Sequence, residues 1–487
     1  MMTRSHVASI GEVLGNWATG HRPLYQSLAA AFRDAILRGD LRPEEVLPPE
    51  RVLAQTLAVS RTTVIAALEQ LKDEGWVEAR HGRGTWVRRR PGDRELRGAD
   101  PIPSLRGNPS VRDEELTTID LATATVAPSQ HVIRTIGALT PDDARELADA
   151  ASYAPQGLPQ LRRAVAEYVS ELGVPTTPHQ VLITTGSQQA IALLAAHFLR
   201  SSDTFIVENP TSPGALDAFR ATGARARWIA VGPDGADVDA LSELLSDPSR
   251  QCVYAIPTYQ SPTGTVMPVE RRRALAGLAD RLQIPMIEDL SQSWLPLDEG
   301  SPPPAVASFS SADQVVIVDS MSKLFWSGLR IGWIRAGDGL IHRLSHAKTL
   351  ADLGTPLLSQ LVAARLLPVQ GQIRAERREV LSRRLLVAKE LLGSLLPDWT
   401  WSSPRGGVAI WVRIPHGSAR GLAQHALRFG VTVVAGPLLA VDDSYDDHLR
   451  ISFGLPEAEL EEGIRRLAAA WVSYRTSPDR LPEAVVI

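Results

Sequence analysis

The chain has 487 residues, of which 44% are hydrophobic and 22% charged, and its formal net charge is −4. These values are typical of a soluble globular protein with two or three domains, and they exclude a polyanion-binding surface spread over the whole chain. The single cysteine, Cys252, excludes a disulfide framework and favours a reducing, cytoplasmic location. The first residues lack a signal-peptide pattern, and no apolar run reaches the ~18 residues of a membrane-spanning helix.

The first ninety residues show helical spacing of apolar side chains, followed by two short strand-like runs. The spacing predicts three helices, over residues 24–37, 49–57 and 61–74. Ser60 precedes the third helix and has the side chain of an N-cap, and Gly75 ends it. The two runs, 76–80 and 85–88, flank a glycine-rich tip and predict a β-hairpin. Three helices and a hairpin predict an N-terminal winged helix-turn-helix over residues 21–90.

Residues 91–118 differ in composition from both of their flanks. They contain repeated prolines and little apolar periodicity. This composition predicts a linker, and its length would allow the head to reach a partner subunit.

From residue 119 to residue 475, short apolar runs alternate with helical stretches. Five runs predict strands of a mostly parallel sheet that helices cover on both faces: 181–185, 204–207, 252–256, 285–288 and 315–318. Three later runs predict a small α+β subdomain: 407–412, 431–434 and 449–452. Residues 476–487 are expected to be a tail.

Lys323 follows the last of the five predicted strands. A lysine at the mouth of a buried strand can have a lowered pKa and act as an amine nucleophile. Ser320 and Arg330 lie on either side of it and could together hold a phosphate. The segment from Asp319 to Trp333 resembles the lysine motif of fold-type I pyridoxal phosphate enzymes, which hold their cofactor as a Schiff base.

Other strand ends carry groups suited to the same ligand, as expected for an α/β sheet. The backbone amides of Gly186, Ser187 and Gln188 open a predicted helix and could bind an anion, although for this loop taken alone a strand-to-helix turn with a capping serine is the favoured explanation. Asp289 could pair with a pyridinium nitrogen, or it could simply form a turn. Arg450 could hold a substrate carboxylate in a bidentate pair, or it could be a solvated strand residue.

These motifs occur in an order that resembles class I aminotransferases over nearly all of 119–473. The segments are Tyr153–Gly157, Thr185–Gln188, Val207–Pro210, Ser261–Gly264, Glu288–Asp289, Ser320–Lys323, Gly328–Gly332 and Leu449–Arg450. The resemblance implies an α/β fold-type I, pyridoxal phosphate-dependent large domain with a small α+β subdomain. It also implies cofactor contacts from Ser261 and Ser291, where many relatives have asparagine and tyrosine. Ser212 replaces a stacking aromatic residue, so we expect cofactor binding with slow turnover.

The head resembles the GntR winged-helix signature in Leu47–Ala54, Val59–Val64 and Gly82–Thr85. The resemblance implies that the helix from Arg61 enters the major groove of double-stranded DNA. The implied DNA-binding residues are Arg51, Ser60, Arg61, Thr62, Thr63, His81, Gly82 and Arg83. Across 22–90 there are 12 Lys or Arg against 9 Asp or Glu, a difference of +3. This excess is modest, so the motif carries the prediction.

A GntR-type head joined to an aminotransferase-like body is the layout of the MocR subfamily of transcription regulators. The resemblance implies a homodimer, often with the head of one subunit against the body of the other. It also implies pyridoxal phosphate as cofactor or effector, with or without a small amino compound; we expect no metal and no membrane partner. A ligand would shift the population between two arrangements of the body. Two alternatives remain open: a working aminotransferase with a tethering head, and a DNA-binding protein whose body serves only dimerisation.

Overall fold

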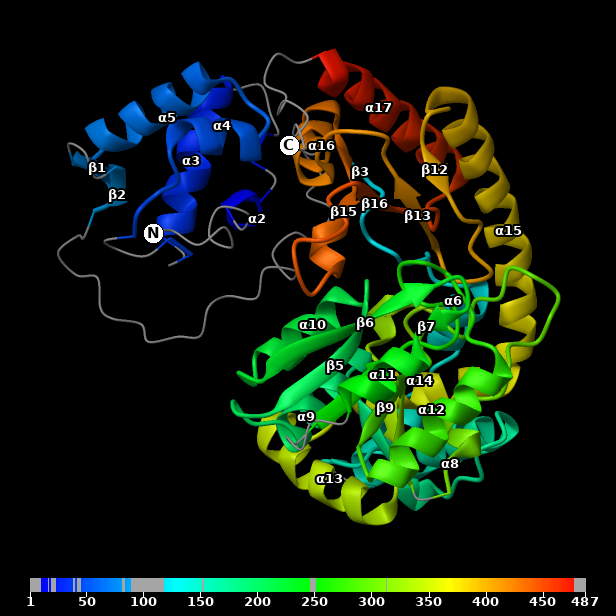
Figure 1. Cartoon of the computed structure of the whole chain (residues 1–487). Coiled ribbons are helices and arrows are strands. Elements are labelled where there is room, and N and C mark those ends of the chain that lie inside the picture. The colour runs from blue at the N-terminus through cyan, green and yellow to red at the C-terminus, as the bar shows by residue number, and fades with distance from the viewer. Residues whose placement is uncertain are drawn as a thin grey trace.

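The computed structural model describes residues 10–15, 17–18, 23–37, 40–41, 45–80, 84–88, 118–150, 153–245, 251–311 and 313–476. These residues form a helical head, a large α/β domain and a smaller subdomain (Figure 1). In this part of the chain, none of the helices is long and apolar enough to cross a membrane.

The head contains the predicted three helices and hairpin. Its elements are α3 (Leu24–Leu37), α4 (Glu50–Thr56), α5 (Arg61–Asp73), β1 (Val77–Arg80) and β2 (Gly84–Val87). Leu28, Phe32 and Val64 are among the fully buried residues of its core. A short helix α2 (Ile10–Leu14) packs into the same core, so the packed head extends beyond the predicted start at residue 21. The predicted hairpin tip, the linker up to residue 117 and the tail after Thr476 lie outside the described residues.

The large domain is built on an eight-stranded sheet with the order β4-β11-β10-β9-β8-β5-β6-β7. The strands are β4 (Val181–Thr184), β5 (Thr204–Asn209), β6 (Arg225–Gly232), β7 (Gly235–Ala236), β8 (Gln251–Ala255), β9 (Met286–Asp289), β10 (Val315–Ser320) and β11 (Gly332–Arg335). Strands β10, β9, β8, β5 and β6 pair in parallel, whereas β11 is antiparallel to both of its neighbours. The five predicted strands are therefore present, and β6, β7 and β11 are additional.

Helices cover both faces of this sheet. Alternate residues of each strand point to opposite faces, and in β10 Val316 and Val318 join one apolar cluster while Val315 and Ile317 join another. The first cluster holds α9 (Ser187–Phe198), α10 (Pro213–Arg220) and α13 (Asp338–Asp352). The second holds α6 (Gln130–Gly137), α7 (Pro141–Ala150), α8 (Pro159–Glu171), α11 (Val238–Leu244), α12 (Val269–Leu282) and α14 (Leu357–Leu366).

A long helix, α15 (Gln370–Leu395), leads from the large domain into the small subdomain (Figure 1). The subdomain sheet has the order β12-β13-β16-β15. Its strands are β12 (Thr400–Trp401), β13 (Ala409–Arg413), β15 (Val434–Ala435) and β16 (His448–Ser452), accompanied by α16 (Ala419–Ala426) and α17 (Glu457–Thr476). A separate parallel pair joins β14 (Val431–Thr432) to β3 (Ile119–Asp120), the first strand after the linker.

Candidate functional site

The predicted cofactor residues meet at one edge of the large sheet. Strands β4, β8, β9 and β10 run in the same direction, so their carboxyl ends lie along that edge. Gly186 follows β4, Ser261 follows β8, Asp289 ends β9 and Ser320 ends β10. Arg330 precedes the antiparallel strand β11 and therefore reaches the same edge from the opposite direction.

Lys323 lies in the turn that follows β10. Its Nζ donates a hydrogen bond to the carbonyl of Ala124 at 2.5 Å. The Nζ atom is enclosed, although part of the side chain is reachable by solvent, and burial lowers its pKa to about 8. The Arg450 guanidinium lowers it further, and the carboxylate of Asp289 opposes both effects. A substantial fraction of the amine is therefore neutral near pH 8, as a nucleophilic lysine requires.

The loop between β4 and α9 can receive an anion. Gly186 is the N-cap of α9 with φ 84°, and no side chain caps the helix. Arg330 donates from Nη2 to the carbonyl of Thr185 at 2.8 Å. A Cβ atom on Gly186 would lie 2.8 Å from the same nitrogen, so glycine is what lets the guanidinium rest against this loop. Uncapped amides and a guanidinium together favour a phosphate.

Two serines and a glutamine complete this end of the site. The Ser320 hydroxyl lies 2.9 Å from the Ser322 hydroxyl and also donates to the carbonyl of Ile331 at 3.3 Å. Ser187 is half-buried in the first turn of α9. The side chain of Gln188 donates to the carbonyl of Gly214 at 2.7 Å, and its backbone amide lies in the uncapped first turn of α9.

Asp289 is held at the other end by two donors. It is 4% exposed, and its Oδ2 accepts a hydrogen bond from the Tyr254 hydroxyl at 2.6 Å. Its Oδ1 accepts from the backbone amide of Ser291 at 2.8 Å. Burial and the carboxylate of Asp289 raise the pKa of Tyr254 well above its usual value, so the hydroxyl stays a donor. These two hydrogen bonds therefore fix the position of the Asp289 carboxylate at the edge of the sheet.

Sequence analysis missed Tyr254. The signal was a tyrosine within the apolar run of β8, because a buried phenol needs a polar partner. Ser212 also hydrogen-bonds this tyrosine, although it offers no ring. The side-chain hydroxyls of Ser261 and Ser291 have no protein partner among the described residues, and both remain available to a ligand.

Arg450 approaches the same space from the small subdomain. It lies on β16, between Trp411 of β13 and Val434 of β15. Its Nη2 donates to the carbonyl of Ala122 at 2.8 Å, and its Nε is buried without a partner in the described structure. Burial lowers its pKa to about 10, against the opposing effect of Asp120. A buried guanidinium with an unused donor is suited to a carboxylate.

The structure describes five of the eight predicted DNA-binding residues of the head: Arg51, Ser60, Arg61, Thr62 and Thr63. The Ser60 hydroxyl accepts from the Thr63 backbone amide at 3.1 Å, which confirms the predicted N-cap. Arg51, Arg61 and Thr62 are exposed. Arg61 pairs with Glu50 at 3.0 Å, so DNA would have to compete for its guanidinium. His81, Gly82 and Arg83 lie outside the described residues.

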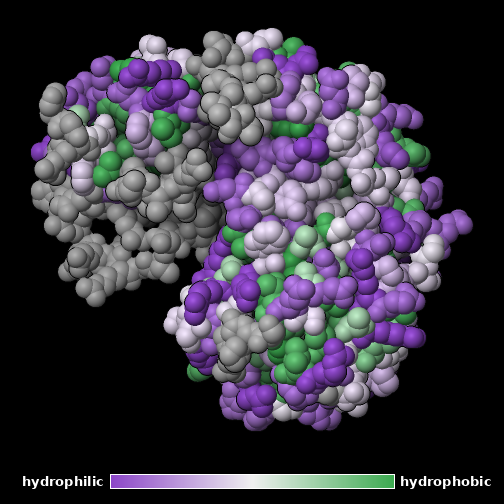
Figure 2. Space-filling view, viewed as in Figure 1, coloured by the Kyte–Doolittle hydropathy of each residue, from purple (hydrophilic) through white to green (hydrophobic). Residues whose placement is uncertain are grey.

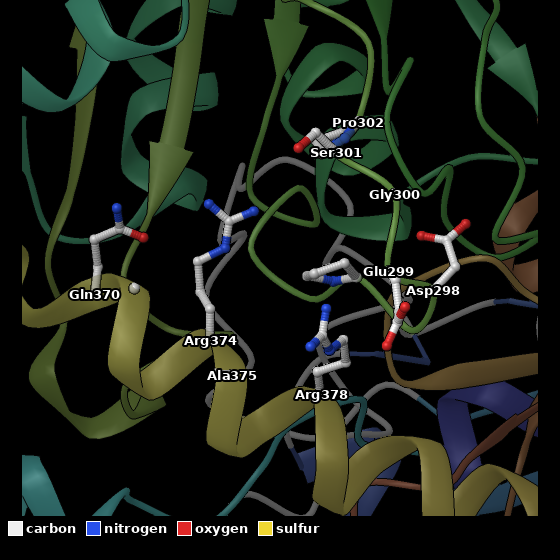
Figure 3. Close-up of a pocket in the computed structure, with 11 residues that line it drawn as sticks. Asp298, Glu299, Gly300, Ser301, Pro302, Gln370, Arg374, Ala375 and Arg378 are labelled. Carbon is white, nitrogen blue, oxygen red and sulfur yellow. The ribbon is translucent and has the colours of Figure 1, made fainter.

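A separate cavity of about 290 Å³ lies against α15 (Figure 3). Arg374 and Arg378 project into it from successive turns of the helix, facing the loop with Asp298 and Glu299. None of the predicted cofactor residues lines this cavity. The two acidic and two basic residues that line this cavity have a net charge of zero, so the cavity does not favour an anion. The edge of the sheet, in contrast, does favour one.

Residues 120–467 match the family described as aminotransferase class I and II, and residues 24–87 match bacterial regulatory proteins of the gntR family. The aminotransferase match spans more than half of the chain. A probable rhizopine catabolism regulatory protein MocR from Rhizobium meliloti is 32% identical over 330 residues, which cover 64% of each chain. The chain belongs to the MocR subfamily of GntR-type regulators. It is a GntR-type regulator fused to an aminotransferase-like domain.

Similarity to another regulator sequence extends over both parts of the chain. The HTH-type transcriptional regulator YisV of Bacillus subtilis is 28% identical over 93% of this chain and 98% of its own. The 2-aminoadipate transaminase of Thermus thermophilus is 33% identical, over 66% of this chain and 81% of its own. Among solved structures, α-aminoadipate aminotransferase from T. thermophilus, complexed with N-(5'-phosphopyridoxyl)-L-leucine, has a TM-score of 0.68 at 29% identity. That match covers 74% of this chain and 93% of the enzyme.

Proposed function

We propose that this regulator binds pyridoxal phosphate at the edge of its large sheet and uses it to sense a small amino compound. The observation that carries the proposal is the convergence of Lys323, Asp289, Arg330 and the α9 N-terminus on one edge, with Arg450 facing them. The fold relatives include a pyridoxal phosphate-type enzyme whose structure contains a phosphopyridoxyl compound.

The residues at this edge fit the cofactor in charge and in order. Arg330, Ser320 and the amides of Gly186, Ser187 and Gln188 would hold its phosphate. Asp289 would pair with the ring nitrogen, and the hydroxyls of Ser261 and Ser291 would face the ring substituents. When bound, the cofactor supplies an aldehyde for the Lys323 amine and a ring that withdraws electrons.

Arg450 would bind the carboxylate of the effector. Its Nε is buried and unpaired in the described structure, and its Nη2 is held only by a backbone carbonyl. A carboxylate would satisfy both atoms in one bidentate pair. The effector class is therefore an amino compound with a carboxylate.

The head would bind double-stranded DNA through α5. Arg61 and Thr62 would face bases or phosphates in the major groove, and Arg51 a neighbouring phosphate. Ser60 and Thr63 would hold the start of the helix, while the hairpin tip with His81, Gly82 and Arg83 would lie at the minor groove. This function places the protein in the cytoplasm.

We infer a homodimer from the apolar surface of the large domain. In Figure 2, hydrophobic residues are gathered most densely over the lower part of the molecule, which is the large domain. Ile133 on α6 is 50% exposed, Leu353 at the C-cap of α13 is 45% exposed, and Leu358 in the first turn of α14 is 54% exposed. Such apolar side chains favour a protein interface. A head-to-tail dimer is compatible with the linker length.

The test is an absorption spectrum of the purified protein with added pyridoxal phosphate, repeated with a panel of amino acids. We expect a visible band that Lys323→Ala abolishes and that some amino acid changes. Operator binding by the same samples should depend on that amino acid. Steady keto-acid production would favour the alternative, a working aminotransferase with a DNA-binding head.

A further inference from the structure

Thr185 begins the loop that leads from β4 into α9, and it is held on both of its sides. We call this loop, from Thr185 to Gln188, the phosphate loop. The Thr185 carbonyl accepts the hydrogen bond from Arg330, and the Thr185 amide donates to Oε1 of Gln189 at 2.8 Å. Gln189 lies in the first turn of α9, so its side chain returns to the start of the loop. The shape of the loop therefore depends on which end of the Gln189 amide group faces Thr185.

Asp352, the last residue of α13, determines that orientation. Its Oδ2 accepts a hydrogen bond from Nε2 of Gln189 at 2.6 Å. An ionised carboxylate only accepts hydrogen bonds, so it faces the NH2 group of Gln189 and turns the carbonyl oxygen toward the Thr185 amide. The reverse orientation would place two acceptors together at Asp352 and two donors together at Thr185. One carboxylate thus selects the orientation in which Gln189 holds the loop.

Asp352 is itself fixed by a buried cation. The side chain of Lys348, one turn earlier on α13, is 0% exposed, and its Nζ donates to both carboxylate oxygens of Asp352 at 2.7 Å. The backbone amide of Gly354 donates to Oδ1 at 3.0 Å. Burial alone would raise the pKa of Asp352, but the hydrogen bonds from Lys348 and Gln189 lower it below its usual value. The carboxylate therefore stays ionised and keeps one position.

The burial of this ion pair needs a reason beyond stability. Taking an ammonium group out of water is costly even when the group is paired. The pair of Arg465 with Glu461 has the same spacing on α17, but both of its side chains are exposed. Water cannot reach Lys348 to replace its bonds to Asp352, so this pair holds its geometry where an exposed pair would exchange. A fixed geometry is useful at the end of a chain of hydrogen bonds that leads to a ligand loop.

We propose that Asp352, fixed by Lys348, is a positioning residue of the phosphate site. It acts through Gln189 on Thr185 and thereby sets the directions of the amides in the phosphate loop, without touching the phosphate. The ligand class is a phosphate monoester such as pyridoxal phosphate. The inference rests on the proposed function, because it requires a phosphate to bind at this loop.

The test compares pyridoxal phosphate with pyridoxal, which lacks the phosphate. The apparent Kd of each compound is measured from the visible band that depends on Lys323. Asp352→Asn and Gln189→Met should each raise the Kd of pyridoxal phosphate about tenfold, the effect of losing one hydrogen bond to a charged group, and leave that of pyridoxal unchanged. Inorganic phosphate should compete with pyridoxal phosphate less well in both variants than in the wild type. Glu461→Gln, which alters the acid of the exposed α17 pair, is the matched control and should change neither Kd.

Two double variants test the order of the contacts. Asp352→Asn combined with Gln189→Met should bind pyridoxal phosphate no more weakly than Gln189→Met alone, because residues that act in one chain of hydrogen bonds are not additive. Lys348→Met combined with Asp352→Asn removes both charges and leaves no unpaired ammonium group. This variant should show the same selective loss as Asp352→Asn, which separates positioning from the cost of a buried charge.

Two results would overturn the inference while the proposed function stands. Equal losses for pyridoxal and pyridoxal phosphate would mean that the ion pair only supports the fold. Unchanged Kd values in Asp352→Asn and Gln189→Met would mean that the loop keeps its shape without them. A wild type that forms no visible band with either compound would overturn the proposed function and the inference together. Circular dichroism and thermal unfolding establish that each variant is folded.

Discussion

Lys323 lies close enough to the guanidinium of Arg450 for the two cations to affect one another. Burial and this neighbouring cation both lower the Lys323 pKa, and only Asp289 opposes them. A carboxylate bound to Arg450 would partly neutralise the cation and thereby raise the pKa of the lysine. Effector binding and cofactor attachment are therefore linked electrostatically at the level of two side chains.

The first prediction follows from this linkage. The rate at which pyridoxal phosphate attaches to Lys323 should rise with pH and level off above about 8, since the neutral amine is the nucleophile. Arg450→Gln should move the midpoint to higher pH, because a cation that lowers the Lys323 pKa is removed. Absorbance measures the rate, and borohydride reduction with peptide mapping locates the label. A label on another lysine, or an unmoved midpoint, would contradict this assignment.

A second prediction concerns the buried carboxyl of Glu208 in β5. Burial raises its pKa from 4.5 to about 7, despite hydrogen bonds from the Ile256 amide and the Gln260 side chain. Between these two pH values the folded protein binds more protons than the unfolded chain. The free energy of unfolding should therefore fall as pH rises through this window, by up to about 3 kcal/mol from this group.

Glu208→Gln should remove that part of the pH dependence, because the amide cannot ionise. Urea denaturation at pH 5 and pH 8 gives the difference between variant and wild type, in which all other groups cancel. The exposed Glu167→Gln variant on α8 is the control. Parallel pH profiles for Glu208→Gln and the wild type would be inconsistent with the raised pKa.

Sequence patterns identified single residues where the neighbouring residues in the sequence are themselves informative. Lys323 and Asp289 follow apolar strands, and their position at the strand ends could be predicted from those runs alone. Tyr254 could not, because its partner Asp289 is 35 residues away and only the pairing of β8 with β9 brings them together. The contact of Lys323 with Ala124 could not be predicted for the same reason, because the two residues are distant in sequence.

Secondary-structure elements were predictable where one apolar pattern dominates. The helix α5 begins after the predicted cap, and its buried residues, which include Val64, Ala67 and Leu68, recur at helical spacing. The strand β6 (Arg225–Gly232) was missed because it lies toward the edge of the sheet and most of its residues are exposed or half-buried. The strand β11 follows a tight turn at Arg330, and its sequence has only two apolar residues, Trp333 and Ile334, between Gly332 and Arg335, so it shows no apolar run.

The third prediction belongs to α5. Arg61→Ala should weaken specific operator binding by about 1–3 kcal/mol if the guanidinium contacts a base edge. Glu50→Gln should strengthen binding, because it frees Arg61 from a 3.0 Å ion pair and removes a negative charge near the DNA. Electrophoretic mobility shifts or fluorescence anisotropy at fixed salt measure both effects. If Arg61→Ala unfolds the head, the residue is structural and the assignment fails.

At the scale of the whole molecule, the small subdomain contributes residues both to the core of the head and to the ligand site. The α16 end of that subdomain completes the core of the head, and its β16 strand carries Arg450 to the ligand site. Sequence analysis predicted both bodies and the linker between them, but not this shared element. The contacts of Leu427 and Arg428 with the head span about 370 residues of sequence, as in the bond from Arg428 to Ala58, so no local pattern reveals them.

The last prediction concerns turnover by the assembled body. Efficient transamination requires the cofactor ring to be held still while a proton moves beside it. In this chain Ser212 offers no aromatic face and instead hydrogen-bonds Tyr254, while Ser261 and Ser291 present only small hydroxyls. We therefore expect an amino compound to change the cofactor spectrum, since Lys323 and Arg450 suffice for its entry. Keto acid should form far more slowly than the ~10 s⁻¹ of ordinary enzymes.

Single-turnover and steady-state assays with common amino donors measure this rate. Ser261→Asn adds the amide that many class I enzymes have at this position, so it should tighten cofactor binding. Ser310→Asn, which alters a serine paired with Asp280 instead of one at the sheet edge, is the control. A wild-type rate near ~10 s⁻¹ would mean that serines hold the ring well enough for catalysis. The body would then act mainly as an enzyme, and the head would place that enzyme on DNA.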